Sequence, residues 1–249
     1  MKKIAVAAAA VLAFAIVLSG CQFNLFGVLD TIKIPSAGDL LTAASENAKG
    51  FVSDVQDYID SGAVTEDNAD DVVAALENVY TSQPDSETGQ RAALLAGEIS
   101  ITADPETKQV VDNVVGTFTA MMDPDYVPPS GDSDTEALLR GLFPPDDTDF
   151  SSIYDNLTHA AKAYKKFAGT IDTDGNGAVD DPPKWIEKSE YFEKGDVVTY
   201  AIVSIAVTAF DEQTLHDFLY GSGDLGATDP VNDAPELLAL LDFAEVSLN

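Results

Sequence analysis

Apolar residues recur at the period of an α-helix through most of the sequence, and this pattern restricts the fold more than any other feature. It runs from Leu40 to Ile59, from Val72 to Tyr80, from Val110 to Met122 and from Ile153 to Phe167. A helix with one apolar face is stable when that face is buried against another element. The sequence therefore predicts an all-α protein.

Residues with helix-capping and helix-breaking properties separate these segments. Ser36, with Asp39 three residues later, has capping-box spacing and predicts one long helix that closes at Ser61 and Gly62. Thr65 precedes a second helix, and the pair Asp104 and Pro105 interrupts the chain again. Short helical segments are also expected around 137–143, from Pro183, near Leu215 and from Pro235.

The segment 197–210 is almost wholly apolar and follows Gly195 and Asp196. Its length favours a helix buried on all sides, while its β-branched residues leave a strand as the alternative. We expect an irregular helical bundle or an α-hairpin array around this buried helix. Residues 36–249 are interpreted as a single helical domain, with long loops near 123–134 and 144–151 where proline and glycine gather.

The first 20 residues have the three zones of a secretion signal. Lys2 and Lys3 precede an apolar run from Ile4 to Leu18, and small residues follow. The run is shorter than the roughly 20 apolar residues that a transmembrane helix needs. Residues 1–20 are therefore predicted to be a signal peptide.

The signal ends in Leu18-Ser19-Gly20-Cys21, which resembles the lipobox of bacterial lipoproteins at all four positions. The resemblance implies that Cys21 is lipidated on sulfur and begins the mature protein, with 21–35 as a lipidated leader. Gln22 in place of Asp resembles the address of an outer-membrane lipoprotein that faces the periplasm. The alternative is an ordinary secretion signal that ends near the chain's only cysteine.

The formal net charge of −30 restricts the partners. Such a surface repels phosphates and so excludes nucleic acid, and it disfavours anionic lipid headgroups. Attachment to a membrane would therefore depend on lipid chains rather than on charge. The acidity also fits a solubility coat, because acidic residues are spread over the whole chain.

Oxygen-bearing side chains alternate in one stretch, Asp172-Thr-Asp-Gly-Asn-Gly-Ala-Val-Asp180. Asp172, Asp174 and Asn176 occupy positions one, three and five of a loop, Ala178 offers its carbonyl at seven, and Asp180 falls at nine. The stretch resembles the calcium loops of EF-hand and dockerin proteins, and a predicted helix precedes it as it does in them.

Position twelve departs from that resemblance. Calcium loops carry a bidentate acidic residue there, whereas this chain has Pro183. Asp181 or Glu187 could substitute, or water could fill the gap. We expect a structural Ca²⁺ site at the weak end of the range, with a dissociation constant on the order of 10⁻⁴ to 10⁻³ M. The alternative is a solvated turn, because Asp, Asn and Gly tolerate tight backbone angles.

The sequence gives little support for catalysis. His159 and His216 are the only histidines and share no motif, and no nucleophile elbow or phosphate-binding loop is present. One cluster of basic residues lies near the end of a predicted helix and consists of Lys162, Lys165 and Lys166. It is interpreted as complementing the negative end of that helix, and the alternative is a docking patch for an acidic partner.

The expected function is therefore a non-enzymatic binding or assembly component of the bacterial cell envelope, with another envelope protein as its partner. The alternative is a helical accessory or solute-binding subunit of an envelope transporter, whose small-molecule ligand the sequence does not identify. That alternative requires a ligand-sized cavity lined by aromatic residues such as Tyr164, Trp185 and Tyr200.

Overall fold

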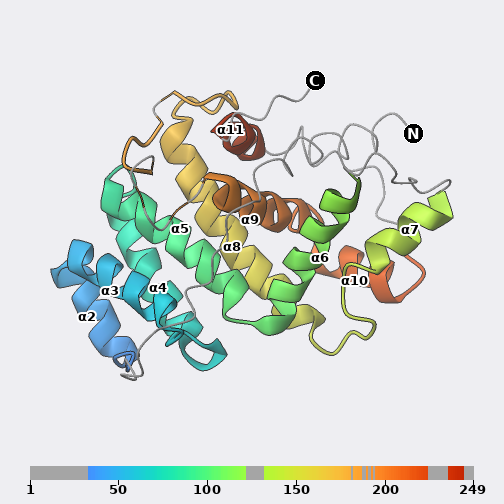
Figure 1. The fold of residues 1–249 in the computed structure, drawn as a ribbon, viewed down its shortest axis with the longest axis horizontal. Coiled ribbons are helices and arrows are strands. Elements are labelled where there is room, and N and C mark those ends of the chain that lie inside the picture. The colour runs from blue at the N-terminus through green and yellow to red at the C-terminus, as the bar shows by residue number, and fades with distance from the viewer. Residues whose placement is uncertain are drawn as a thin grey trace.

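The computed structural model describes residues 33–121, 132–180, 182–186, 189, 192, 194–223 and 235–243. Within these ranges the chain forms ten helices and no strand, so the all-α prediction is confirmed. The helices pack as a bundle (Figure 1). Their bounds are α2 Ala37–Glu46, α3 Ala48–Asp60, α4 Glu66–Ser82, α5 Glu87–Thr102, α6 Pro105–Met121, α7 Asp132–Arg140, α8 Phe150–Ile171, α9 Lys194–Val207, α10 Glu212–Tyr220 and α11 Pro235–Phe243.

No helix in the described ranges has the length and apolar character that crossing a bilayer requires.

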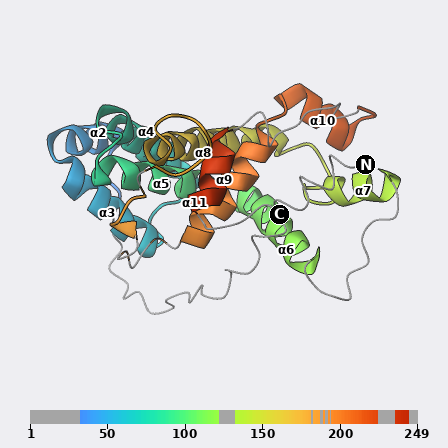
Figure 2. The ribbon, with the colours of Figure 1, turned by 90° about the horizontal axis from the view of Figure 1, so that it is seen from above.

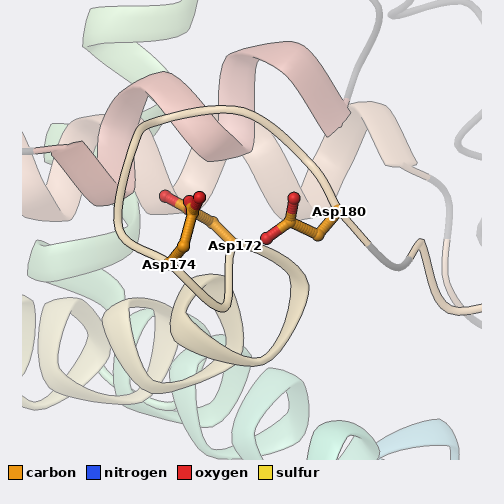
Figure 3. A group of neighbouring side chains, drawn as sticks. All are labelled: Asp172, Asp174 and Asp180. Atoms are coloured by element: carbon orange, nitrogen blue, oxygen red, sulfur yellow. The ribbon is translucent and has the colours of Figure 1, made fainter.

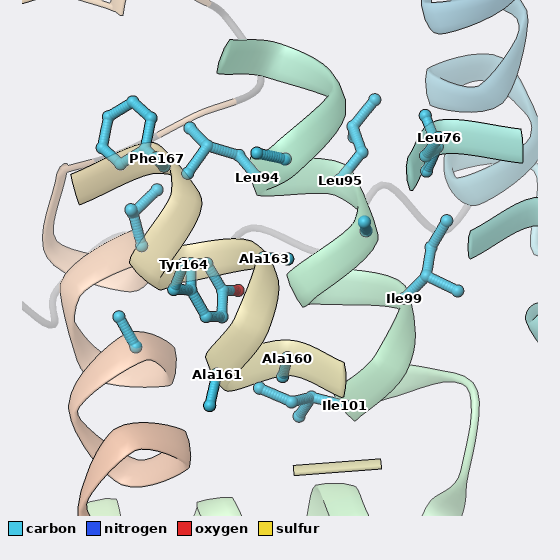
Figure 4. Close-up of a cluster of buried hydrophobic side chains, with 14 of the residues drawn as sticks. Leu76, Leu94, Leu95, Ile99, Ile101, Ala160, Ala161, Ala163, Tyr164 and Phe167 are labelled. Atoms are coloured by element: carbon cyan, nitrogen blue, oxygen red, sulfur yellow. The ribbon is translucent and has the colours of Figure 1, made fainter. Parts of the chain in front are cut away.

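Helices α5 and α8 form the centre of the bundle, packed against each other along their length (Figures 1 and 4). The α8 residues Tyr164 and Phe167 are 1% and 0% exposed, and Leu95 of α5 is 0% exposed. The two helices lie close together at Gly97, where an added Cβ would lie 2.5 Å from the Tyr164 ring. A glycine at this position therefore makes room for a buried aromatic ring.

The segment expected to form one long helix is two helices in the structure. Asn47 leaves the helical conformation, with φ −146° and ψ 65°, and separates α2 from α3. Its backbone N–H donates to the Ala43 carbonyl at the end of α2, and its side-chain oxygen accepts from the Gly50 N–H at 3.2 Å. One residue thus caps both helices, which the shared apolar period conceals.

A smaller apolar cluster lies at the end of the molecule opposite α2 and α3, where α7, α10 and the start of α8 meet (Figures 1 and 2). Phe150, Leu215, Phe218 and Leu219 are buried in it. Arg140 closes α7 onto α10, because its guanidinium donates to the Leu219 carbonyl at 2.6 Å and lies over the Phe218 ring.

Several predicted boundaries move in the structure. The helix expected around 137–143 spans Asp132–Arg140, so the end of the loop near 123–134 is helical, while residues 122–131 lie outside the described part. The loop near 144–151 ends at Asp149, and α8 begins at Phe150. Most of the apolar segment 197–210 lies in a helix, α9, which begins at Lys194 and ends at Val207; Asp211 then caps α10. After Pro183 the described residues form a turn in which the Ile186 N–H donates to the Pro183 carbonyl, and the Ser189 N–H in turn donates to the Ile186 carbonyl.

We predict that Gly97→Ala destabilises the fold. The new methyl group meets the Tyr164 ring inside the packed core, and overpacking of this kind costs about 1–3 kcal/mol. Gly169→Ala in α8 is the control, because a Cβ there has no neighbour within 4 Å and Ala favours a helix. Chemical denaturation of both variants measures the difference, and equal stability of the two would contradict the close packing at Gly97.

Candidate metal-binding loop

The acidic loop begins where α8 ends. Asp172 directly follows Ile171, and its backbone N–H still donates to the Ala168 carbonyl at 2.9 Å. Asp172 is only 6% exposed although its side chain is a carboxylate. The central helix of the bundle therefore fixes the first residue of the loop (Figure 3).

The Asp172 carboxylate organises the turn by accepting three backbone N–H groups. Its Oδ1 accepts from Gly175 at 2.9 Å and from Asn176 at 3.1 Å, and its Oδ2 accepts from Gly177 at 2.8 Å. Gly175 and Gly177 have φ angles of +73° and +83°. Only glycine enters this region without steric cost, so both glycines are needed for the loop to wrap around Asp172.

The next two oxygen-bearing residues repeat the same local contact. Asp174 Oδ1 accepts from the Asn176 N–H at 3.1 Å, and Asn176 Oδ1 accepts from the Ala178 N–H at 2.8 Å. Residues at the first, third and fifth positions thus each bind the backbone ahead of them. Hydrogen bonds from the backbone N–H groups to these side-chain oxygens therefore hold the loop in its conformation.

Asp180 closes the loop. Its N–H donates to the Ile171 carbonyl at 2.8 Å, and its Oδ2 accepts from the Thr173 hydroxyl at 2.8 Å and from the Thr173 N–H at 3.1 Å. The Thr173 hydroxyl, followed by the Thr173 N–H, lowers the pKa of this carboxyl below its ordinary value because both stabilise the charged form. Asp180 therefore keeps its negative charge down to low pH.

The loop brings three carboxylates together. One carboxylate oxygen from each of Asp172, Asp174 and Asp180 lies within 4.8 Å of the others (Figure 3). Like charges at this separation repel, whereas a bound cation would hold them together. An acidic triad that can hold a metal ion is thus present at three of the predicted positions, and its ligands are the hard oxygens that calcium prefers.

The other predicted ligands are placed less completely. Ala178 lies in the loop and its described hydrogen bond is that of its N–H, while Pro183 at position twelve is buried. Asp181 and Glu187 lie outside the described residues, as does the predicted lipidation site Cys21.

Helix α11 contacts the loop at two positions. The Val179 N–H donates to Asp242 Oδ2 at 2.8 Å, and a Cβ added to Gly177 would lie 2.9 Å from the Cβ of Leu238. Val179 also packs against the main core. The sequence pattern did not reveal this neighbour, because Asp242 is 63 residues from Val179.

A partly buried chain of hydrogen bonds connects the segment after the loop to the central helices. The Trp185 indole N–H donates to Gln90 Oε1 at 2.7 Å, and Gln90 Nε2 donates to the Thr170 hydroxyl at 3.1 Å. The Thr170 hydroxyl in turn donates to the Phe167 carbonyl. Gln90 is 8% exposed and lies on α5, so it joins α5 to the last turn of α8 and to the chain beyond the loop.

The histidines lie apart from the loop residues in the contacts that the structure describes. His159 is exposed on α8. The His216 ring contacts the Phe150 ring edge-on and the Tyr220 ring at a tilt, and its ring nitrogens lie 3.5 Å from Asp147 and 3.6 Å from Asp217. This is an aromatic contact with acidic neighbours at the α7 and α10 end of the molecule.

Other residues that the sequence offered as candidate binding residues form an ion pair or pack in the core. Lys162 of the basic cluster pairs with Glu77 of α4. Among the aromatic residues that would line a solute cavity, Tyr164 is buried against Gly97, and both Trp185 and Tyr200 pack against the main core. These three side chains therefore contribute to core packing.

Comparisons of the chain with protein-family models, with curated proteins and with solved structures find no match. The likeness to calcium loops consequently depends on the residues of 172–180 and on their hydrogen bonds. That pattern is the feature of the described chain that bears most directly on function.

A second buried carboxylate, Asp104, serves a different purpose. It precedes Pro105 at the start of α6 and accepts hydrogen bonds from the Glu106 N–H, the Thr107 hydroxyl and the Asn156 amide of α8. Burial alone would raise the pKa of Asp104, but the hydrogen bonds from Thr107 and Glu106 outweigh burial and lower it. Asp104 thus caps α6 and links it to α8 as a charged group.

We predict a pH-dependent stability difference between the wild type and Asp104→Asn. Because the folded-state pKa is lowered, the carboxylate stabilises the fold fully above its unfolded value of about 3.9, and this contribution is lost as the pH falls through the lower folded-state value. Near neutral pH the wild type should be more stable by about 1 kcal/mol.

Urea denaturation at a series of pH values measures the difference in unfolding free energy between the wild type and Asp104→Asn. Asp85→Asn is the control for loss of an exposed charge. The gap for Asp104→Asn should narrow as the solution becomes strongly acidic. A gap that stays constant across the series would contradict the role of the charged carboxylate.

Proposed function

We propose that this chain is a non-enzymatic lipoprotein of the bacterial cell envelope, anchored through Cys21, whose helical domain is braced by Ca²⁺ in the loop 172–180. The domain would act as a binding or assembly component for another envelope protein. The observation that carries the calcium part is the convergence of Asp172, Asp174 and Asp180 within 4.8 Å. The lipobox sequence supports the anchor.

The residues of the loop fit calcium by their chemistry. Asp172, Asp174 and Asp180 supply carboxylates, and Asn176 supplies an amide oxygen two residues after Asp174. Calcium takes six to eight oxygen ligands in flexible geometry, so water and neighbouring carbonyls can complete its shell where Pro183 replaces an acid. A bound ion would supply charge neutralisation and no chemical step.

The position of the loop supports a structural use of the metal. The loop follows the central helix α8, lies against α11, and precedes the segment whose Trp185 bonds to α5. An ion that binds only the folded loop stabilises the domain by mass action. The same ion would fix the direction in which the chain leaves α8.

We predict that Ca²⁺ raises the thermal midpoint of the domain. At a concentration of about ten times the dissociation constant, binding stabilises the folded state by about 1.4 kcal/mol, which corresponds to about 3–6 °C for a domain of this size. Asp172→Ala combined with Asp174→Ala should abolish the rise, whereas Asp54→Asn with Asp57→Asn, two exposed acids of α3, should retain it.

Differential scanning calorimetry with Ca²⁺ and with a chelator measures the shift. An unchanged midpoint in millimolar Ca²⁺ would show that the stretch is a solvated turn held by its own hydrogen bonds, and it would remove the calcium part of the proposal.

We predict that the full chain, expressed in a bacterium that processes lipoproteins, sediments with membranes and carries acyl groups on Cys21. Cys21→Ser should move most of the protein to the soluble fraction, because lipid chains supply the membrane affinity. Gln22→Ser, which leaves the four lipobox positions intact, is the matched control. Fractionation and intact-mass spectrometry give the readout, and a membrane-bound Cys21→Ser protein would contradict lipidation.

A further inference from the structure

Helix α11, which packs against α8, also touches the candidate metal loop. Asp242 of α11 accepts the Val179 N–H at 2.8 Å, and Leu238 lies against the backbone of Gly177. Leu238 and Asp242 are four residues apart, so they share one face of the helix. This face meets the loop between its sixth and eighth positions.

The rest of α11 is held by apolar packing. Leu237, Leu240, Leu241 and Phe243 are buried, and the helix packs against both α8 and α9. The Phe243 ring contacts the Phe167 ring edge-on at 5.7 Å between centroids. Asp242 itself is exposed, so its contact with the loop adds a polar attachment to a helix that is otherwise held by burial.

The polar attachment depends on the state of the loop for two reasons. Val179, whose N–H donates to Asp242, lies two residues after Gly177, whose N–H donates to Asp172, so a change in the turn around Asp172 would move the Val179 N–H. The Asp242 carboxylate also binds the backbone of a segment that carries three other carboxylates, so its charge is repelled unless a cation offsets them.

We propose that divalent-cation binding in the loop 172–180 controls the docking of helix α11 onto α8 and α9. This inference rests on the calcium site proposed above. A cation that binds the wound loop more tightly than the open loop stabilises docked α11 by the difference between the two affinities. By linkage, docking of α11 raises the affinity of the loop for the cation by the same factor.

In this scheme Asp242 is a positioning residue that acts through the backbone of Val179. Its release would uncover the apolar side chains of α11 and the surfaces of α8 and α9 beneath them, including Phe167. The calcium concentration around the protein would therefore regulate how much of this apolar surface is open.

Hydrogen exchange followed by mass spectrometry tests the proposal on the lipid-free chain, with Ca²⁺ or a chelator present. In the wild type, Ca²⁺ should slow exchange of the α11 amides by on the order of tenfold, the effect expected for a hydrogen bond to a charged acceptor. In Asp242→Ala the calcium effect on α11 should fall below about twofold, because the coupling is lost. Glu236→Ala on the same helix should retain the calcium effect.

Native mass spectrometry of the same samples reports whether Ca²⁺ is bound. Bound Ca²⁺ with unchanged exchange of α11 in the wild type would overturn the docking proposal and leave the calcium site intact. An absence of bound Ca²⁺ would overturn both. The wild-type comparison needs no substitution, so the result does not depend on whether Asp242→Ala folds.

Discussion

The close contact between α5 and α8 is the constraint on which the rest of the structure depends. Gly97 allows the Tyr164 ring to lie against the α5 backbone, and the other helices then pack around this pair, with α4 on α5 and α9 on α8. Each large apolar side chain buried there contributes about 1.5–3 kcal/mol. Because the acidic loop begins at the end of α8 and Gln90 belongs to α5, the same pair also fixes the surroundings of the loop.

The chain carries 43 acidic and 13 basic residues, so its carboxylates cannot all be paired with basic side chains. The structure instead stabilises several of them with backbone N–H groups. Asp104 and Asp211 accept such groups at the starts of α6 and α10, and Asp172 accepts three of them after α8. Backbone dipoles thus replace missing cations at these positions. The triad is where three carboxylates converge in the described chain.

Short-range patterns in the sequence predicted much of the fold and of the loop. Helical periodicity predicted the segments that form α4, α6 and α8, because the apolar residues of each helix recur within a few turns of the chain, and the spacing from Asp172 to Asp180 predicted that three carboxylates lie together. The break at Asn47 was not predicted, because this residue caps two helices without disturbing the apolar period. The Gln90 contacts with Thr170 and Trp185 span 80 and 95 residues, and no local pattern encodes such pairs.

Trp185 is the only tryptophan in the chain, and its indole N–H is bonded to Gln90 at the point where the segment after the loop meets the core. Its ring is partly buried and meets Phe192 edge-on. Indole emission depends on the polarity and hydrogen bonding around the ring, so the tryptophan fluorescence of this protein, excited at wavelengths that its eight tyrosines do not absorb, comes from a single place beside the acidic loop. The chain therefore contains its own optical probe, and events at the loop can be followed in unlabelled protein.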